Sequence, residues 1–106
     1  MANYLLAYKG GGMATTDAER EAAMAAWGSW FGTLGPAIVD PGNPFGPSAS
    51  VGPDGNLGGS VSSGLTGYSV LSADSLAAAG ELAKGCPVLA AGGSVEVYEA
   101  IPIEGM

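Results

Sequence analysis

Gly and Pro are concentrated in the middle of the chain, and this distribution limits the possible folds more than any other feature of the sequence. Fourteen of the 33 residues from Gly35 to Gly67 are Gly or Pro, a density that interrupts helices and strands. The segments on either side carry regular apolar patterns. We therefore expect two ordered ends joined by a loose middle segment, with residues 1–106 forming one domain of 10.3 kDa.

The amino-terminal part predicts a strand followed by a helix. The apolar run Asn3–Tyr8 lacks polar alternation, which is typical of a central strand with apolar surroundings on both faces. Gly10–Gly12 end this strand, and Thr16 with Glu19 forms a capping box that begins a helix ending near Gly35. The inward face of this helix is predicted from its spacing to contain Ala23, Trp27, Trp30, Phe31 and Leu34.

Four further elements are predicted after Gly35. They are a second strand from 37–39 and part of 45–51, a strand at 65–71, a helix over 75–84 with Leu76, Ala79, Leu82 and Ala83 inward, and a last strand at 94–101. A turn is also predicted at 53–56, between the second and third strands. On the last strand, Glu96 and Tyr98 alternate with Val95 and Val97, so the two pairs face opposite sides of the sheet.

The order strand, helix, strand, strand, helix, strand predicts an α+β protein with a ferredoxin-like βαββαβ fold. Both helices then cover one face of a four-stranded antiparallel sheet. We expect Tyr4, Leu6 and Tyr8 on the other face, with Tyr68 and Tyr98 beside them. Exposed apolar area costs about 25 cal/mol per Å², so a second copy is expected to cover that face. The prediction is a homodimer with a cleft between its subunits.

Charge and composition exclude several classes of function. Three Lys and Arg against ten Asp and Glu give a net charge of −7, so neither nucleic acid nor an anionic membrane is an expected partner. The absence of His excludes His-based triads and His-ligated zinc. Asp40, Asn43 and Asp54 carry oxygen ligands, but roles in turns explain them more simply than a metal does. We expect no metal and no cofactor.

The single cysteine and the short amino-terminal apolar run predict a cytoplasmic protein, and neither Cys86 nor Gly10–Gly12 is expected to form a reactive site. Cys86 is the single cysteine and cannot form an internal disulfide. It follows a predicted helix end, where thiolate is disfavoured, so a small buried side chain is expected rather than a nucleophile. The apolar run Tyr4–Tyr8 is too short for a signal peptide or a membrane span. Gly10–Gly12 lack the residues of a phosphate-binding motif and are interpreted as a connector.

Three stretches of sequence carry a family resemblance. They are YLLAY at 4–8, AAWGSWFGTLGPAIVDPGNPFG at 25–46, and residues 64–103, where LAKGCPVLAAGGSVEV is the most specific part. Together they resemble the YCII-related family, including its DGPF-type members. The resemblance implies a dimeric α+β barrel of ferredoxin-like subunits, and it covers nearly the whole chain.

Some members of that family carry a His and Asp pair thought to act as an acid-base dyad in the barrel cleft. In this chain, Met24 to Trp27 occupy the segment in which that His would lie. The nearest match to the DGPF string is Asp40 to Phe45, which reads DPGNPF. The resemblance therefore implies the fold and the dimer but not the dyad chemistry.

The candidate ligand-binding residues lead to two functional interpretations. The candidates are Tyr4, Tyr8, Trp27, Asp40, Tyr68, Glu96 and Tyr98, although core or interface positions also suit the aromatic ones. We favour a non-catalytic dimeric module that binds a small, largely apolar molecule or serves a regulatory partner. The alternative is a lyase- or isomerase-type enzyme of small organic molecules that uses Glu96 or an Asp of the middle segment for proton transfer. The sequence has no matched nucleophile and base, which favours the first.

Overall fold

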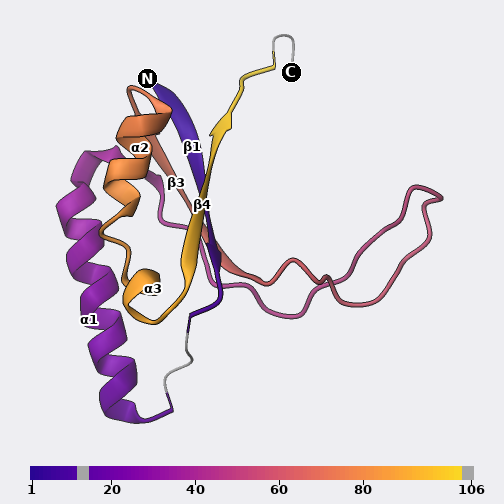
Figure 1. The fold of residues 1–106 in the computed structure, drawn as a ribbon, viewed down its shortest axis with the longest axis horizontal. Helices are drawn as coiled ribbons and strands as arrows, with labels where there is room; N and C mark the ends of the chain where they lie inside the picture. Colours follow the sequence, from indigo (N-terminus) through magenta and orange to yellow (C-terminus); the bar gives the residue numbers. More distant parts are fainter. Residues whose placement is uncertain (12–14, 104–106) are drawn as a thin grey trace.

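The computed structural model describes residues 1–11 and 15–103, so Gly12 of the predicted connector lies outside the described residues. Its four-stranded antiparallel sheet has the order β2-β3-β1-β4. The strands are β1 (Ala2–Lys9), β2 (Ile38–Asp40), β3 (Leu65–Ala73) and β4 (Ser94–Ala100). The helices α1 (Asp17–Leu34), α2 (Leu76–Ala83) and α3 (Pro87–Ala90) lie on one side of the sheet (Figure 1). This α+β arrangement is compatible with a ferredoxin-like fold.

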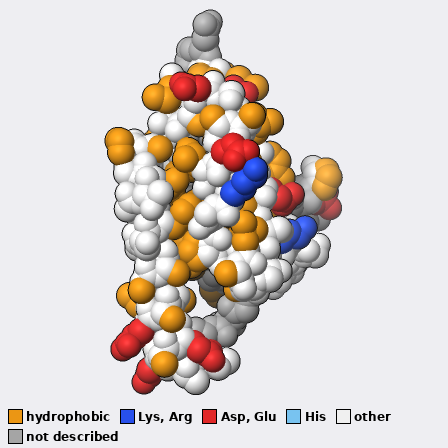
Figure 2. Space-filling model, turned by 60° about the vertical axis from the view of Figure 1, so that its left-hand side comes forward, with side chains coloured by type: hydrophobic (Ala, Val, Ile, Leu, Met, Phe, Trp, Pro, Cys, Tyr) orange, Lys and Arg blue, Asp and Glu red, His pale blue; other side chains and the backbone are white. Residues whose placement is uncertain are grey.

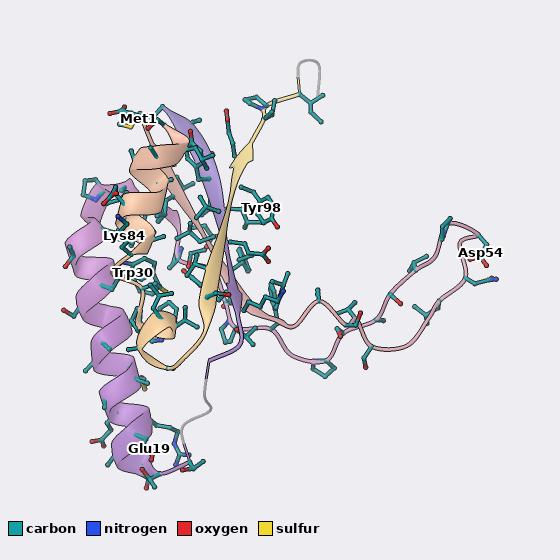
Figure 3. All side chains as sticks on the ribbon, viewed as in Figure 1. Met1, Glu19, Trp30, Asp54, Lys84 and Tyr98 are labelled. Atoms are coloured by element: carbon teal, nitrogen blue, oxygen red, sulfur yellow. The ribbon has the colours of Figure 1, made fainter. Side chains whose placement is uncertain are left out.

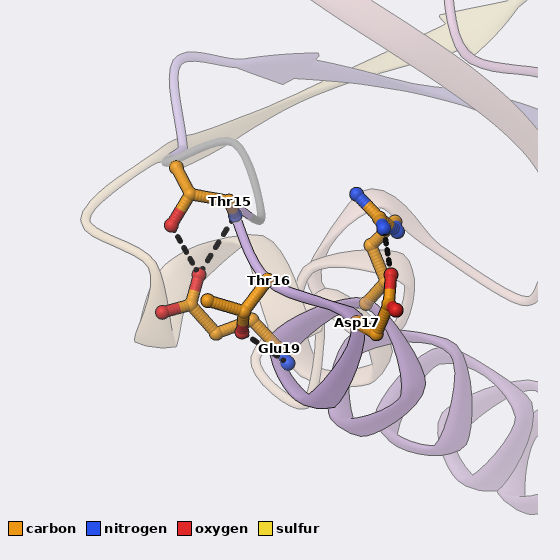
Figure 4. A network of polar contacts seen from close by, with 5 residues as sticks. Thr15, Thr16, Asp17 and Glu19 are labelled. Carbon is orange, nitrogen blue, oxygen red and sulfur yellow. Dashed lines mark hydrogen bonds and ion pairs between the residues drawn. The ribbon is translucent and has the colours of Figure 1, made fainter.

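The helix predicted after Thr16 is confirmed as α1, at both of its ends. The Thr16 hydroxyl accepts a hydrogen bond from the Glu19 N–H at 3.1 Å, as expected for an N-cap. The Glu19 carboxylate reaches Thr15 instead of Thr16, accepting bonds from its N–H at 2.8 Å and its hydroxyl at 3.0 Å (Figure 4). At the other end, Gly35 has φ 55°, a conformation that favours Gly, and the short 3₁₀ turn η1 (Gly35–Ala37) leads into β2.

The expected direction of the β1 side chains is wrong. Tyr4, Leu6 and Tyr8 are buried beneath the helices instead of lying on the open face. Leu6 pairs with Ser69 on one side and Val97 on the other, and side chains directly opposite each other share a face. Since β1 is apolar on both faces, its own pattern could not decide which set of residues points to the helices.

The open face of the sheet carries the alternate residues. Leu5 lies between Val70 and Tyr98, while Ala7 lies between Tyr68 and Glu96. Figure 3 shows Tyr98 on the opposite side of the sheet from the helices, and this side chain is 52% exposed. The predicted positions of Tyr68 and Tyr98 on the open face are confirmed, as is the opposite facing of the β4 valines, which pack against the core.

The second helical region is shorter than predicted and is followed by an additional turn of helix. The Ser75 hydroxyl caps α2 by accepting a bond from the Ala78 N–H at 3.1 Å. Ala79 and Ala83 are buried as expected, whereas Leu76, predicted inward, is 55% exposed in the first turn of the helix. The Trp30 indole N–H of α1 donates to the Leu82 carbonyl of α2 at 3.1 Å, which ties the two helices together.

Residues 45–64, which we call the arm, run out on the side of the sheet opposite the helices (Figures 1 and 3). The arm has little regular pairing, and Val51 forms a single bridge with Leu57. The prediction that part of 45–51 belongs to the second strand is wrong, since β2 ends at Asp40. The predicted turn at 53–56 is confirmed, since the Gly55 N–H bonds the Gly52 carbonyl at 2.9 Å. None of the helices in the described ranges is long and apolar enough to cross a membrane.

Candidate functional site

A cavity of about 550 Å³, a size typical of small-molecule sites, lies between α1 and β3. Figure 2, which views the helix side, shows apolar side chains exposed across this surface, whereas acidic side chains gather at its lower end, where α1 begins. The cavity is lined by Ala23, Met24, Trp27, Gly28 and Phe31 of α1, Val88 of α3, residues 41–44, and Tyr8, Thr66, Gly67, Tyr68 and Ser69 of the sheet.

The helical wall of the cavity is aromatic because α1 presents Trp27 and Phe31 one turn apart. Their ring centroids are 5.8 Å apart. The Tyr8 ring of β1 meets the Trp27 ring edge-on, at 5.0 Å and 72°, an arrangement that favours aromatic pairs. Trp30 packs behind them at 6.5 Å from Tyr8. The result is a preformed apolar surface held by both a helix and a strand.

Two glycines allow the opposite wall to form, because residues 41–44 cross β3 at very close range. Gly42 has φ 76°, and a Cβ on it would lie 1.7 Å from the Tyr68 carbonyl oxygen. A Cβ on Gly67 would lie 3.1 Å from the Asn43 carbonyl. The Asp40 carboxylate accepts a hydrogen bond from the Gly42 N–H at 2.8 Å. The predicted turn role of Asp40 is thereby confirmed, and it supports this wall from outside the cavity lining.

A chain of hydrogen bonds closes the inner end of the cavity. The Tyr8 hydroxyl donates to the Ser69 hydroxyl at 2.6 Å, and Ser69 donates to the Pro41 carbonyl at 2.6 Å. Ser69 is fully buried. Burial raises the pKa of Tyr8 to about 12, although its bond to Ser69 acts in the opposite direction. Tyr8 therefore stays protonated near neutral pH and serves as a neutral polar group.

The structure brings together only part of the predicted set of ligand-binding residues. Tyr8, Trp27 and part of Tyr68 line the cavity. The Tyr68 ring, however, lies on the open face, because Tyr68 pairs with Ala7 and its ring stacks on that of Phe45 with centroids 5.8 Å apart. Tyr4 lies in a separate buried cluster with Ala73 and Ala79. Burial raises the pKa of Tyr4, and the nearby Glu99 charge raises it further.

Glu96 and Tyr98 form a pair on the open face, away from the cavity. The Tyr98 hydroxyl donates to the Glu96 carboxylate at 3.2 Å. This bond and the carboxylate charge raise the pKa of Tyr98, since both stabilise the protonated phenol. Because the sheet separates the pair from the helix side, Glu96 cannot act on a molecule held beside Trp27.

Sequence reasoning missed the polar end of the cavity. Nothing in the sequence identifies the Pro41 carbonyl as the acceptor of the Ser69 proton, because every residue has a backbone carbonyl. Ser69 did carry a weak signal, since it shares its strand face with Leu71, where a polar residue must find a buried partner.

Cys86 lies in the wall of a second, more open hollow that shares Trp27, Thr66 and Val88 with the first. It is 3% exposed, as expected for a small buried side chain. Burial raises the pKa of its thiol to about 11, while a backbone hydrogen bond from Val88 acts against this rise. The thiolate that a nucleophile requires is therefore disfavoured.

The chemistry available at the cavity is that of a neutral binding site. The part of its lining that the structure describes holds no Asp, Glu, Lys or Arg. Across residues 1–11 and 15–103, no three Cys, Asp or Glu side chains gather in a way that could hold a metal ion. Comparison of the chain with protein-family models, with curated proteins and with solved structures found no match.

Proposed function

We propose that this protein is a non-catalytic, cytoplasmic, homodimeric module that binds a small, largely apolar molecule in the cavity between α1 and β3. The proposed subunit has the ferredoxin-like fold that the resemblance to YCII-related proteins implies. One observation carries the proposal: the neutral, aromatic-walled cavity of about 550 Å³ that Tyr8, Trp27 and Phe31 line. Apolar walls with few polar groups are typical of sites that bind small organic ligands.

Binding is favoured over catalysis because the titratable groups near the cavity are poorly tuned for proton transfer. A general acid or base works best with a pKa near the working pH. The pKa of Tyr8 is about 12 and that of Cys86 is about 11. Glu96, the base of the alternative lyase or isomerase, lies on the open face. An enzyme built on Glu96 would therefore need a different cavity, one completed by a second subunit.

The proposed dimer is supported by the apolar character of the open face. Leu5, Val70 and Tyr98 form one cross-strand row there, and the stacked rings of Phe45 and Tyr68 lie nearby. Tyr98 is 52% and Phe45 48% exposed in the single chain. A second copy lying across this face would remove these side chains from water, which favours association.

Two glycines on α1 provide a matched test of the cavity. Gly28 lines it and Gly32 does not, and nothing lies within 4 Å of a Cβ built on either. Leu at either position should stabilise the helix by up to about 1 kcal/mol relative to Gly. We expect Gly28→Leu to fill the cavity and Gly32→Leu to leave it open.

The measurement is binding of 2-naphthol, followed by the fluorescence of the tryptophans beside the cavity and by thermal shift. The unchanged protein should gain about 2.7 kcal/mol of stability at 100 times Kd. Gly28→Leu should weaken binding at least about tenfold, which corresponds to about 1.4 kcal/mol. Equal binding by the Gly28 and Gly32 variants would show that the probe binds elsewhere and would remove the proposal.

A further inference from the structure

We infer that the ligand of this cavity is a neutral, flat molecule that directs a hydrogen-bond donor, a hydroxyl or an N–H, at the oxygen of Tyr8. The inference rests on the proposed function, since it concerns the chemical class of the bound molecule. It follows from the direction of the hydrogen bonds at the inner end of the cavity.

The direction of these bonds is fixed by the Pro41 carbonyl, which can only accept. The Ser69 hydroxyl lies 2.6 Å from it and must use its single proton there. Ser69 then has no proton for Tyr8, whose hydroxyl lies 2.6 Å away, so Tyr8 must donate its own. The Tyr8 oxygen is left with lone pairs only, and it accepts no hydrogen bond from the described residues.

A third hydroxyl in the lining is committed in the same way. Thr66 lies 3.3 Å from the carbonyl oxygens of both Tyr8 and Gly10, and these groups too can only accept. The hydroxyls of Tyr8, Ser69 and Thr66 therefore all direct their protons into the protein. Ser69 is fully buried, so the Tyr8 and Thr66 oxygens are the ones that can accept from a bound molecule, and this part of the cavity selects a donor.

The remaining donors of the lining lie where water competes. Trp27 is half-buried and Asn43 is exposed, so a ligand acceptor gains little there that water does not already supply. An ionised ligand is disfavoured because no charged side chain among the described lining residues offsets its desolvation. The flat shape follows from the edge-on packing of Tyr8 and Trp27, which leaves aromatic surfaces as walls.

Matched probes test the donor directly. Binding of 2-naphthol, 2-methoxynaphthalene and naphthalene is compared by fluorescence titration. The naphthol should bind about three- to tenfold more tightly than its methyl ether, the range expected for one hydrogen bond. Indole against 1-methylindole repeats the comparison with an N–H donor and should give the same preference.

Two variants separate the role of Tyr8 from general effects on the cavity. Tyr8→Phe removes the acceptor, so the naphthol and its ether should bind equally. Ser69→Ala removes the group that takes the Tyr8 proton, which frees that proton for a ligand. In this variant we expect the methyl ether to gain affinity relative to the naphthol. This second variant is smaller than the wild type at the changed position and serves where Tyr8→Phe fails to fold.

The outcomes distinguish this inference from the proposed function. Tight binding of all three naphthalenes without preference for the naphthol overturns the donor inference and leaves the cavity proposal standing. Preference for the ether in the unchanged protein overturns it equally. No binding of any probe overturns both the cavity proposal and the inference. A naphthol preference that is lost in Tyr8→Phe and reduced in Ser69→Ala supports both.

Discussion

Replacing Gly42 by Ala gives the sharpest test of how the cavity wall is built. Gly42 has φ 76°, and a Cβ there would lie 1.7 Å from the oxygen and 2.6 Å from the carbon of the Tyr68 carbonyl. No side-chain rearrangement can relieve this overlap, because both atoms belong to the backbone of β3. Residues 41–43 would have to move away from the strand, and the contacts that hold them would break.

The expected loss of stability has two parts. Holding an Ala in this conformation costs about 1–3 kcal/mol. Moving residues 41–43 also breaks the bonds from the Tyr68 N–H to Asn43 at 3.3 Å and from Ser69 to Pro41 at 2.6 Å, each worth about 1 kcal/mol. We expect a decrease of about 3–5 kcal/mol in the free energy of unfolding, a large part of the 5–15 kcal/mol typical of a domain.

The assay is urea unfolding followed by circular dichroism, with thermal melting as a second measurement. Each kcal/mol should lower Tm by about 4–8 °C in a domain of this size. Gly35→Ala is the control for positive φ alone, since nothing lies within 4 Å of a Cβ built there. Gly46→Ala is the control without positive φ or a clash. The reasoning fails if Gly42→Ala loses no more stability than Gly35→Ala, or if Gly46→Ala loses as much as either.

Two further predictions concern the buried phenol and the open face. Because burial raises the pKa of Tyr8 from 10.0 to about 12, the unfolded chain loses this proton at lower pH than the folded one. Stability should therefore fall between pH 10 and 12, and urea unfolding of Tyr8→Phe should show a smaller fall over that window. Tyr98→Glu, which puts a second acid beside Glu96 on the open face, should convert the proposed dimer into a monomer with unchanged circular dichroism. Light scattering that shows the unchanged protein to be monomeric at micromolar concentration would refute the proposed dimer.

The longest helix and its ends could be predicted because local chemistry fixes them. Thr16 caps the amino terminus of α1 and Gly35 follows its carboxyl terminus, so both signals depend only on residues close in sequence. The facing of β1 could not be predicted in this way, since Leu5 and Leu6 are equally apolar. The information lay in pairing: β4 alternates clearly, and Leu6 pairs with Val97, which faces the helices. Facing in an apolar strand is thus decided by its neighbours.

The cavity was predicted only in fragments, because it depends on backbone groups. Tyr8 and Trp27 were candidates as aromatic residues, but their meeting depends on how α1 lies against β1. The hydrogen-bond chain ends on the carbonyl of Pro41, which lies within reach of Ser69 only because residues 41–44 cross β3. Such a site follows from the path of the backbone, and the only sign of that path in the composition is the density of Gly and Pro.

The density of Gly and Pro in the middle segment has two different structural causes. In the arm, Gly46 and Gly59 have open space around them, and a side chain there would meet nothing. At residues 41–44 and at Gly67, the same residue types allow the chain to lie directly on β3. One composition therefore produces a loose arm and the most tightly constrained wall of the cavity. Because Ser69 binds Pro41 at this wall, a displacement of the segment would alter both the anchoring of the arm and the donor preference at Tyr8.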